Sequence, residues 1–239
     1  MVNKTGILAV LTVIGGVAGV WIAQTFALSQ GVLMGWGIGT FLTTLLLYFV
    51  VFRNPMRAVA IAPIYAVIQG SFLGVITMFI DRWLASSGYV VAGGVALQAF
   101  VITMAILVSM LTLYYFRILQ ATPMFKRVVL TMVLGIVITY AVTMVLYLFG
   151  VYMPFISVFT TPTDGSGMWI GMAINLFILL VASLMLIIDF KRVEDYVKAG
   201  SPKRIEWYLG FCLLITLIWI YYEAVQLSAR IAILAGGRE

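Results

Sequence analysis

The sequence predicts an all-α membrane protein, a bundle of seven transmembrane helices. Hydrophobic residues make up 64% of the 239 residues and charged residues only 9%, with a mean hydropathy of +1.17. A soluble domain of this size has about 25% charged residues. The apolar residues form stretches that can each cross a bilayer as a helix of roughly 20 residues. The net charge of +6 therefore relates to membrane topology, and we expect no nucleic-acid partner.

Seven apolar stretches of spanning length follow one another. The first begins after Lys4 and is longer than the roughly 7–15 residues of a signal-peptide core. No clear cleavage motif follows it, so we interpret it as the first helix. The predicted helices, in a single domain 1–239, cover residues 6–28, 31–52, 58–80, 91–116, 128–150, 168–190 and 207–235.

Turn and loop residues separate these stretches. Three of the separators are SQG at 29–31, RNPMR at 53–57 and ATPMFKR at 121–127. The most hydrophilic connection is TTPTDGSG at 160–167, and the most charged is KRVEDYVKAGSPKR at 191–204.

Lysine and arginine are unevenly distributed over the connections. Eleven of the 14 lie at the N-terminus or in the second, fourth and sixth connections, and three lie elsewhere. The positive-inside rule then places the N-terminus in the cytoplasm and the C-terminus outside.

Glycines at four-residue spacing indicate faces where helices approach closely. We expect them to pack mainly within the bundle rather than in a dimer. They are Gly15 and Gly19, then Gly31, Gly35 and Gly39, then Gly70 and Gly74.

The last apolar stretch contains an isolated acid. Between Glu206 and Arg230, Glu223 is the only charged residue. A charge at the bilayer centre costs at least about 2.5 kcal/mol, so such residues are rare and usually functional. Thr216 and Gln226 share its helical face, as does Arg230. We interpret Glu223 as part of a proton or ion pathway, with a structural hydrogen bond as the alternative. Arg230 is interpreted as snorkelling to the outer interface.

Two further polar residues lie in or beside apolar stretches. Gln69 follows Tyr65 by one turn and is a candidate for the ion pathway. The alternative is that it makes a hydrogen bond between helices. Asp189 lies at the cytoplasmic boundary and is followed by Lys191 and Arg192. We interpret Asp189 as part of a pH gate. The alternative is that it lies at the membrane interface and is neutralised by these two cations.

Several classes of protein are disfavoured. The chain has no histidine and a single cysteine, Cys212. This excludes histidine-based zinc sites, nucleophile pairs that use histidine, and an intrachain disulfide. No lysine for a retinal Schiff base occurs in 207–235, and no protease motif or P-loop is present. We therefore expect neither an enzyme nor a tightly bound cofactor.

Two segments resemble the signatures of bacterial Bax inhibitor-1-like proteins. NPMRAVAIAPIYAVIQGSFLG at 54–74 is similar to their third helix. LIIDFKRVEDYVKAGSPKRIEWYLGFCLLITLIWIYYEAVQL at 186–227 is similar to their carboxyl-terminal region. The resemblance, which with the seven spans covers most of the chain, implies a bacterial cytoplasmic membrane protein in which six helices surround a central seventh.

The resemblance also implies a proton-sensitive calcium leak. In this family, acids of helices six and seven and an arginine form a pH-sensitive latch. Asp189 matches the acid of helix six. The acid of helix seven is expected near Thr216, where none occurs, so Glu223 and Glu206 are the available acids. Gln69 stands where close relatives are expected to have glutamate.

The chemistry of the candidate ligands favours a weak site. Calcium takes several oxygen ligands, and Asp189 and Glu223 offer only one carboxylate each. Calcium is therefore expected as a transported ion rather than a bound cofactor. Arg57 is the candidate cation partner of Asp189 in the latch. Two alternatives remain: a regulator that binds other membrane proteins, such as proteases or cell-death proteins, and a proton-coupled transporter.

Overall fold

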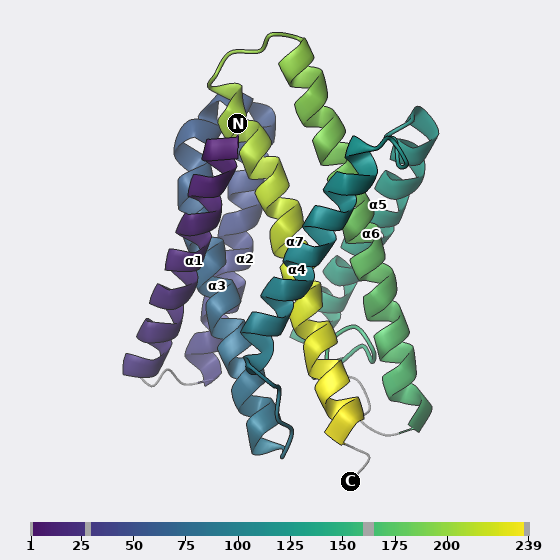
Figure 1. Ribbon diagram of the computed structural model, residues 1–239. Helices are drawn as coiled ribbons and strands as arrows, with labels where there is room; N and C mark the ends of the chain where they lie inside the picture. Colours follow the sequence, from purple (N-terminus) through teal and green to yellow (C-terminus); the bar gives the residue numbers. More distant parts are fainter. Residues whose placement is uncertain (1, 27–29, 160–164, 237–239) are drawn as a thin grey trace. The chain divides into compact units, whose positions relative to one another are not determined.

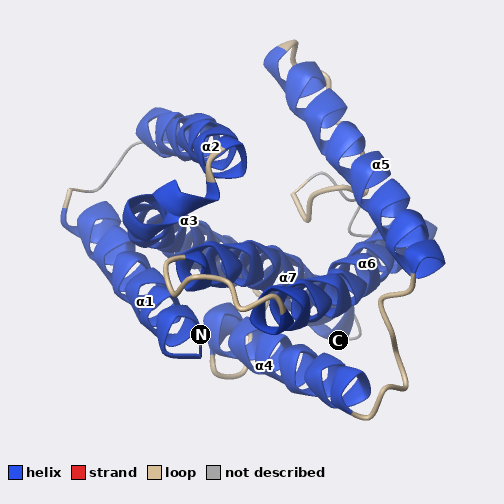
Figure 2. Cartoon of the chain, turned by 90° about the horizontal axis from the view of Figure 1, so that it is seen from above, coloured by secondary structure: helices blue, strands red, loops and turns tan. Residues whose placement is uncertain are grey.

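The computed structural model describes residues 2–26, 30–159 and 165–236. Helices account for nearly all of these ranges, and no strand occurs in them (Figures 1 and 2). The predicted all-α class is confirmed. The helices are α1 Val2–Thr25, α2 Gln30–Arg53, α3 Ala58–Ser86, α4 Gly94–Tyr115, α5 Pro123–Leu148, α6 Gly165–Lys198 and α7 Ile205–Gly236, with a short 3₁₀ helix at Pro55–Arg57.

All seven helices are long and apolar enough to cross a membrane. The mean hydropathy of their most apolar windows ranges from 1.7 to 2.6. The prediction of seven spans is therefore confirmed. The window in α7 is 67% buried, against 11–50% in the other six helices. The central place expected for the seventh helix stays a prediction.

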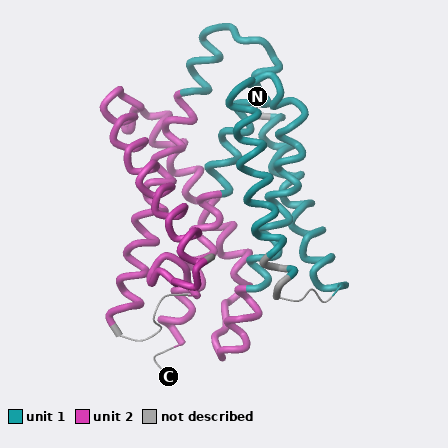
Figure 3. The backbone as a smooth tube through the Cα atoms, turned by 180° about the vertical axis from the view of Figure 1, so that it is seen from behind, with its two compact units in different colours: residues 1–79, 192–218 teal, residues 80–191, 219–239 magenta. Residues whose placement is uncertain are grey.

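The chain divides into two compact units (Figure 3). Unit 1 comprises residues 1–79 and 192–218, and unit 2 comprises residues 80–191 and 219–239. The helices α3, α6 and α7 each contribute to both units. The single domain expected from the sequence stays a prediction.

Glycines bring α1 and α3 into backbone contact in unit 1. A Cβ atom added at Gly70 would lie 2.0 Å from the Thr12 carbonyl oxygen, and one at Gly15 would lie 2.3 Å from the Val67 carbonyl oxygen. Only glycine permits so close an approach. Packing within the bundle is thus confirmed for α1 and α3. In α2, however, Gly35 and Gly39 have nothing within 4 Å of such an atom, and the surroundings of Gly31 lie outside the described residues.

Three helices are longer than the hydropathy pattern predicts. The helix α3 continues to Ser86 rather than residue 80, and α6 and α5 also extend beyond their expected bounds. The helix α6 continues to Lys198, through half of the segment expected to be a loop, because polar residues can extend a helix beyond the apolar span. There Lys198 pairs with Glu194 at the favourable four-residue spacing. The helix α5 begins at Pro123 rather than 128, because the Thr122 hydroxyl accepts a hydrogen bond from the Phe125 amide (3.2 Å) and caps it.

Other boundaries shift by only a few residues. The helix α2 begins at Gln30 inside the expected SQG turn, and α6 begins at Gly165 inside the expected 160–167 loop. The remaining parts of these two turns lie mostly outside the described residues. At the RNPMR turn, the Asn54 side chain accepts a hydrogen bond from the Met56 amide and caps the 3₁₀ helix.

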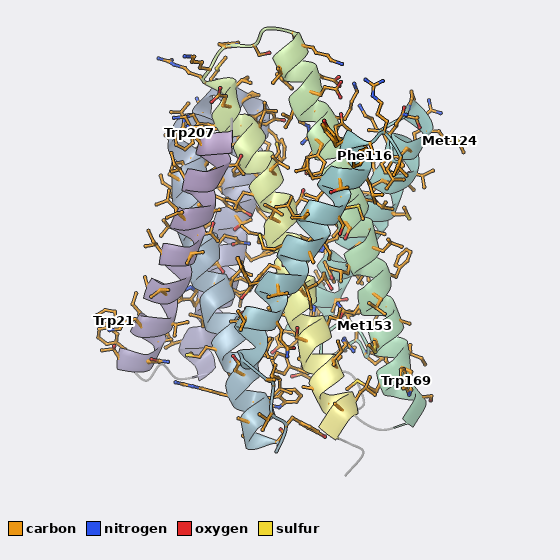
Figure 4. The ribbon with its side chains drawn as sticks, viewed as in Figure 1. Trp21, Phe116, Met124, Met153, Trp169 and Trp207 are labelled. Carbon is orange, nitrogen blue, oxygen red and sulfur yellow. The ribbon has the colours of Figure 1, made fainter. Side chains whose placement is uncertain are left out.

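Aromatic and methionine side chains lie at the helix ends of each unit (Figure 4). In unit 1, Trp21 and Trp207 are at opposite ends, and the Lys4 ammonium lies 4.6 Å from the centre of the Trp207 ring. In unit 2, Phe116 lies at the α4–α5 connection and Trp169 near the start of α6. These are the positions of membrane-interface anchors.

Candidate functional site

Glu223 lies on the buried face of α7 in unit 2 and is only 1% exposed. The Tyr140 hydroxyl of α5 donates a hydrogen bond to its Oε1 at 2.5 Å. The Asn175 amide of α6 donates to its Oε2 at 2.7 Å. One carboxyl group therefore joins three helices of the same unit. We call Glu223, Tyr140 and Asn175 the Glu223 cluster.

The Glu223 cluster is surrounded by apolar side chains. Ile136, Ile178 and Val181 form a buried core, and Tyr140 and Trp219 pack against it. In such a low-dielectric environment a hydrogen bond is stronger than in water, and an unpaired polar group is more costly. The 2.5 Å contact of Tyr140 is at the short end of the range for a hydroxyl bound to a carboxylate.

Two buried polar atoms near the carboxyl group have no hydrogen-bond partner among the residues that the structure describes. They are Asn175 Oδ1 and the indole nitrogen of Trp219. The indole N–H lies close to Glu223 and Tyr140, but it does not meet the geometry of a hydrogen bond to either. Each atom is a candidate partner for a changed form of the carboxyl group or for a water molecule.

These partners suit both protonation states of Glu223. The ionised carboxylate accepts from Tyr140 and Asn175, as observed. A protonated carboxyl needs one acceptor instead. A rotation of the Asn175 amide would present Oδ1, and the Tyr140 oxygen can itself accept a hydrogen bond. The cluster therefore needs only local rotations to hold or release a proton.

Arg230 and Gln226 continue the polar face of α7, and both are buried. The Val158 amide donates to Gln226 Oε1 at 3.2 Å, and Arg230 Nη2 donates to the Phe155 carbonyl oxygen at 3.0 Å. The expected snorkelling of Arg230 is wrong, because its side chain is 0% exposed and is held by a carbonyl group inside unit 2.

Asp189, the expected gate, is buried at 1% exposure in the part of α6 that belongs to unit 2. Its expected partner Arg57 is exposed and belongs to unit 1. The pairing of these two residues stays a prediction. Glu206 is half-buried in the first turn of α7, in unit 1.

The remaining predicted residues make local or interhelical contacts in unit 1. Thr216 is 3% exposed, and its hydroxyl donates to the Cys212 carbonyl oxygen at 3.4 Å. Gln69 Oε1 accepts a hydrogen bond from the Thr44 hydroxyl at 3.2 Å. This contact joins α2 to α3, as the structural alternative for Gln69 proposes.

Of the residues predicted for the pathway, only Glu223 lies in the cluster. Sequence reasoning missed its partners Tyr140 and Asn175. Asn175 could have been identified from the sequence, because it is an amide in the middle of the sixth apolar stretch and such residues often bond to another helix. Tyr140 also lies in the middle of its apolar stretch, but the helix that faces a tyrosine cannot be read from spacing.

No group of three or more acidic, histidine or cysteine side chains comes together in the part of the chain that the structure describes. Oxygen atoms available to a cation near Glu223 are its carboxylate, the Asn175 carbonyl and the Tyr140 hydroxyl. Calcium usually takes six to eight oxygen ligands at about 2.3–2.6 Å, so water would have to supply most of them.

Comparison with known protein families gives a match to the family described as Bax inhibitor 1 like, over residues 1–233. The match covers almost the whole chain. No curated protein matches the chain, and no solved structure matches it.

Proposed function

The chain belongs to the Bax inhibitor 1 like family, and on this premise we propose that it is a proton-sensitive cation leak with calcium as the transported ion. We further propose that Glu223 is a group whose protonation changes the leak. The observation that carries the proposal is the Glu223 cluster, in which a 1% exposed carboxyl group is held by two side chains from two other helices.

The surroundings of Glu223 make its charge the variable part of the cluster. The titratable groups that face it are Tyr140 from α5 and Tyr222 and Arg230 from α7, whereas α6 contributes the amide of Asn175. Tyrosine and arginine titrate far from neutral pH in water, and the carboxyl group is the acid of the set.

Protonation would weaken the contacts between the three helices. A hydrogen bond to an ionised group contributes about 1.5–3 kcal/mol, against about 0.5–1.5 kcal/mol for a neutral pair. Neutral Glu223 would therefore hold α5 and α6 less strongly, and the oxygen atoms of the cluster would be free to face a passing cation. This reasoning gives the sign: the leak should increase on acidification.

Asp189 is proposed as the second acid of the pathway, at the cytoplasmic end of α6. A cation that passes Glu223 towards the cytoplasm would meet a second buried carboxyl group there. Two separated acids suit a leak better than storage, because conduction needs binding weak enough for the ion to leave.

The test is calcium flux into proteoliposomes that contain only the purified protein, measured over a series of pH values. Wild type should conduct more at acidic pH, and Glu223→Gln should conduct with little dependence on pH. Gln has a similar shape and can accept from Asn175 while donating to the Tyr140 oxygen, so the fold should persist. The matched control is Glu194→Gln, the same substitution at a residue that pairs with Lys198 near the end of α6.

The outcomes separate the alternatives. Silence of the wild type would favour a regulator that binds another membrane protein. Accumulation of the cation against its gradient, driven by a proton gradient, would favour a transporter. A Glu223→Gln variant that loses thermal stability but keeps the wild-type flux and pH profile would make Glu223 a structural residue.

A further inference from the structure

Unit 1 carries its charged residues at one end only. Seven cations and three acids give this end a net charge of +4, and the sequence of unit 1 contains no other charged residue. They are the cations Lys4, Arg53, Arg57, Arg192, Lys198, Lys203 and Arg204 and the acids Glu194, Asp195 and Glu206. One end of unit 1 therefore attracts anions, while the opposite end has no charge in its sequence.

The contacts between helices show that these charges belong to the same end. The helices α1 and α3 run in the same direction, because their contacting glycines advance together along both helices. The end of α2 leads directly into α3 and therefore lies at the end where α1 starts. The start of α7 is there too, because the Lys4 ammonium lies over the Trp207 ring. Figure 3 shows the start of α1 and the α6–α7 connection at this end of unit 1.

Two of the cations lie against aromatic rings at the border of the apolar spans. The Arg53 guanidinium lies 5.8 Å from the centre of the Phe49 ring, and the Lys4 ammonium lies 4.6 Å from the centre of the Trp207 ring. Phe49 is 65% exposed within the apolar span of α2, so its ring is available to lipid. A cation over a ring at this border has its charge where the acyl chains of a bilayer meet the headgroups.

Five of the cations have no acid as a partner. We call these five the basic end of unit 1. None of them forms an ion pair with a described residue, whereas Lys198 pairs with Glu194. Four of the five are exposed and one is half-buried, so their charges are open to an external anion. The residues of the basic end are Lys4, Arg53, Arg57, Lys203 and Arg204.

The surroundings of the basic end favour a phospholipid over a soluble anion. Phe52 and Met56 are exposed beside Arg53 and Arg57. A ligand at this place therefore meets apolar side chains and cations together. An anionic phospholipid offers both acyl chains and a phosphate group, which the guanidinium group of arginine binds through two parallel hydrogen bonds. A soluble anion would leave the apolar side chains without a partner.

We propose that the basic end of unit 1 is a docking surface for the headgroups of anionic phospholipids such as phosphatidylglycerol. Each cation near an anionic membrane surface strengthens the association, and the surface attracts most at low ionic strength. The inference goes beyond the proposed function and does not rest on it, because it holds whether or not the protein conducts ions.

The test compares the binding of phosphatidylglycerol and phosphatidylcholine with identical acyl chains to the delipidated protein in a neutral detergent. Each lipid carries pyrene on one acyl chain, and energy transfer from tryptophan measures its binding. Wild type should bind phosphatidylglycerol more tightly, and salt should reduce the difference. Equal binding of the two lipids would overturn the proposal. Glycerol phosphate is the competitor without acyl chains, and displacement of phosphatidylglycerol at an equal concentration would overturn the assignment to lipid.

Substitutions decide whether the basic end is the site. The double variant Arg53→Gln/Arg57→Gln should bind phosphatidylglycerol about 25-fold more weakly, about fivefold for each cation. Phosphatidylcholine binding should not change, and Arg53→Lys/Arg57→Lys should restore most of the preference. The matched control is Lys126→Gln/Arg127→Gln at the start of α5 in unit 2, which removes the same charge and should bind as the wild type does. Equal weakening in the two double glutamine variants would make the preference an effect of net charge and overturn the site.

A single substitution tests the surface when the double arginine variant does not fold. Lys4→Gln leaves both arginines in place and should weaken phosphatidylglycerol binding about fivefold. Thermal unfolding without lipid verifies that each variant is folded. Unchanged phosphatidylglycerol binding by a folded Lys4→Gln variant would overturn the proposal, because Lys4 is the cation that joins α1 to α7 at this end.

Discussion

Unit 1 and unit 2 bury their polar groups in different ways. Unit 1 uses neutral pairs between α2 and α3: Thr44 bonds to Gln69, and the Tyr48 and Tyr65 hydroxyls lie 3.0 Å apart. Unit 2 buries an acid and an arginine on one face of α7. Neutral pairs of this kind do not change with pH near neutrality, whereas a carboxyl group can. The polar groups of unit 1 therefore suit packing, whereas those of unit 2 suit the proposed response to protons.

The contrast also divides α7 along its length. In unit 1 the helix presents Phe211, whose ring packs edge to face on Tyr65 at a centroid distance of 5.0 Å. In unit 2 it presents Glu223, Gln226 and Arg230. Aromatic packing tolerates little change of shape, while hydrogen-bonded side chains can change partners. A helix with these two halves can keep one end packed while the other end responds.

The largest effect on stability is expected from the close helix contact of unit 1. Gly70→Ala would place a methyl group 2.0 Å from the Thr12 carbonyl oxygen, which is backbone and cannot rotate away. We expect destabilisation at the upper end of the about 1–3 kcal/mol typical of overpacking, or more. Thermal unfolding of the detergent-solubilised protein measures it.

The control for this change is Gly39→Ala, where nothing lies within 4 Å of the added atom. It should leave the unfolding temperature unchanged or raise it, because alanine is the better helix former by about 0.5–1 kcal/mol. Equal behaviour of the two variants would show that unit 1 does not depend on the α1–α3 contact.

A matched pair of hydroxyl deletions compares the two units directly. Tyr140→Phe removes a donor to the Glu223 carboxyl group and should cost about 1.5–3 kcal/mol, while Tyr48→Phe removes a neutral pair and should cost about 0.5–1.5 kcal/mol. The cost of Tyr140→Phe is present while the carboxyl group is ionised and should shrink as the pH falls and the carboxyl group takes up a proton. The cost of Tyr48→Phe should stay constant.

Unfolding temperatures of both variants over a pH series provide this measurement. If the two costs fall together on acidification, or neither changes, then the charge of Glu223 does not distinguish the units.

Hydropathy predicted the seven helices because each span must satisfy its backbone hydrogen bonds inside the bilayer, which an unbroken apolar helix does. It failed at the end of α6, where the helix leaves the apolar region and is stabilised by local contacts such as Glu194 with Lys198. The acid Glu223 was predicted because a charge in an apolar stretch is costly. Its partners were not, because which helix faces which depends on tertiary packing, and neither Tyr140 nor the Phe155 carbonyl oxygen has a distinctive sequence pattern.

A smaller effect is expected from the inner acid of unit 2. Asp189→Asn imitates the protonated carboxyl group and should leave calcium flux high and nearly independent of pH, with an increase of about tenfold at neutral pH, or about 1.4 kcal/mol. The flux assay in proteoliposomes measures it. Asp81→Asn is the control, since Asp81 Oδ1 accepts from the Val95 amide at the start of α4 and the asparagine oxygen can do the same.

If the flux of Asp189→Asn overlays the wild type at every pH, Asp189 has no part in the gate. The response of unit 2 would then be confined to the α7 face around Glu223.

The smallest effect is expected from Glu194→Gln, the same substitution as Glu223→Gln at a solvent-facing position. Glu194 and Lys198 are an exposed pair one turn apart on α6, with side chains 34% and 67% exposed. Such pairs contribute about 0.3–0.5 kcal/mol, and salt screens them. The variant should therefore unfold within a degree or so of the wild type, and raising the salt concentration should remove even this difference. The contrast with Glu223 lies in the environment, because bulk water replaces the lost partner at residue 194, whereas residue 223 is buried in the protein. A loss of stability at Glu194 as large as that at Tyr140 would mean that burial does not explain the difference between the polar groups of this protein.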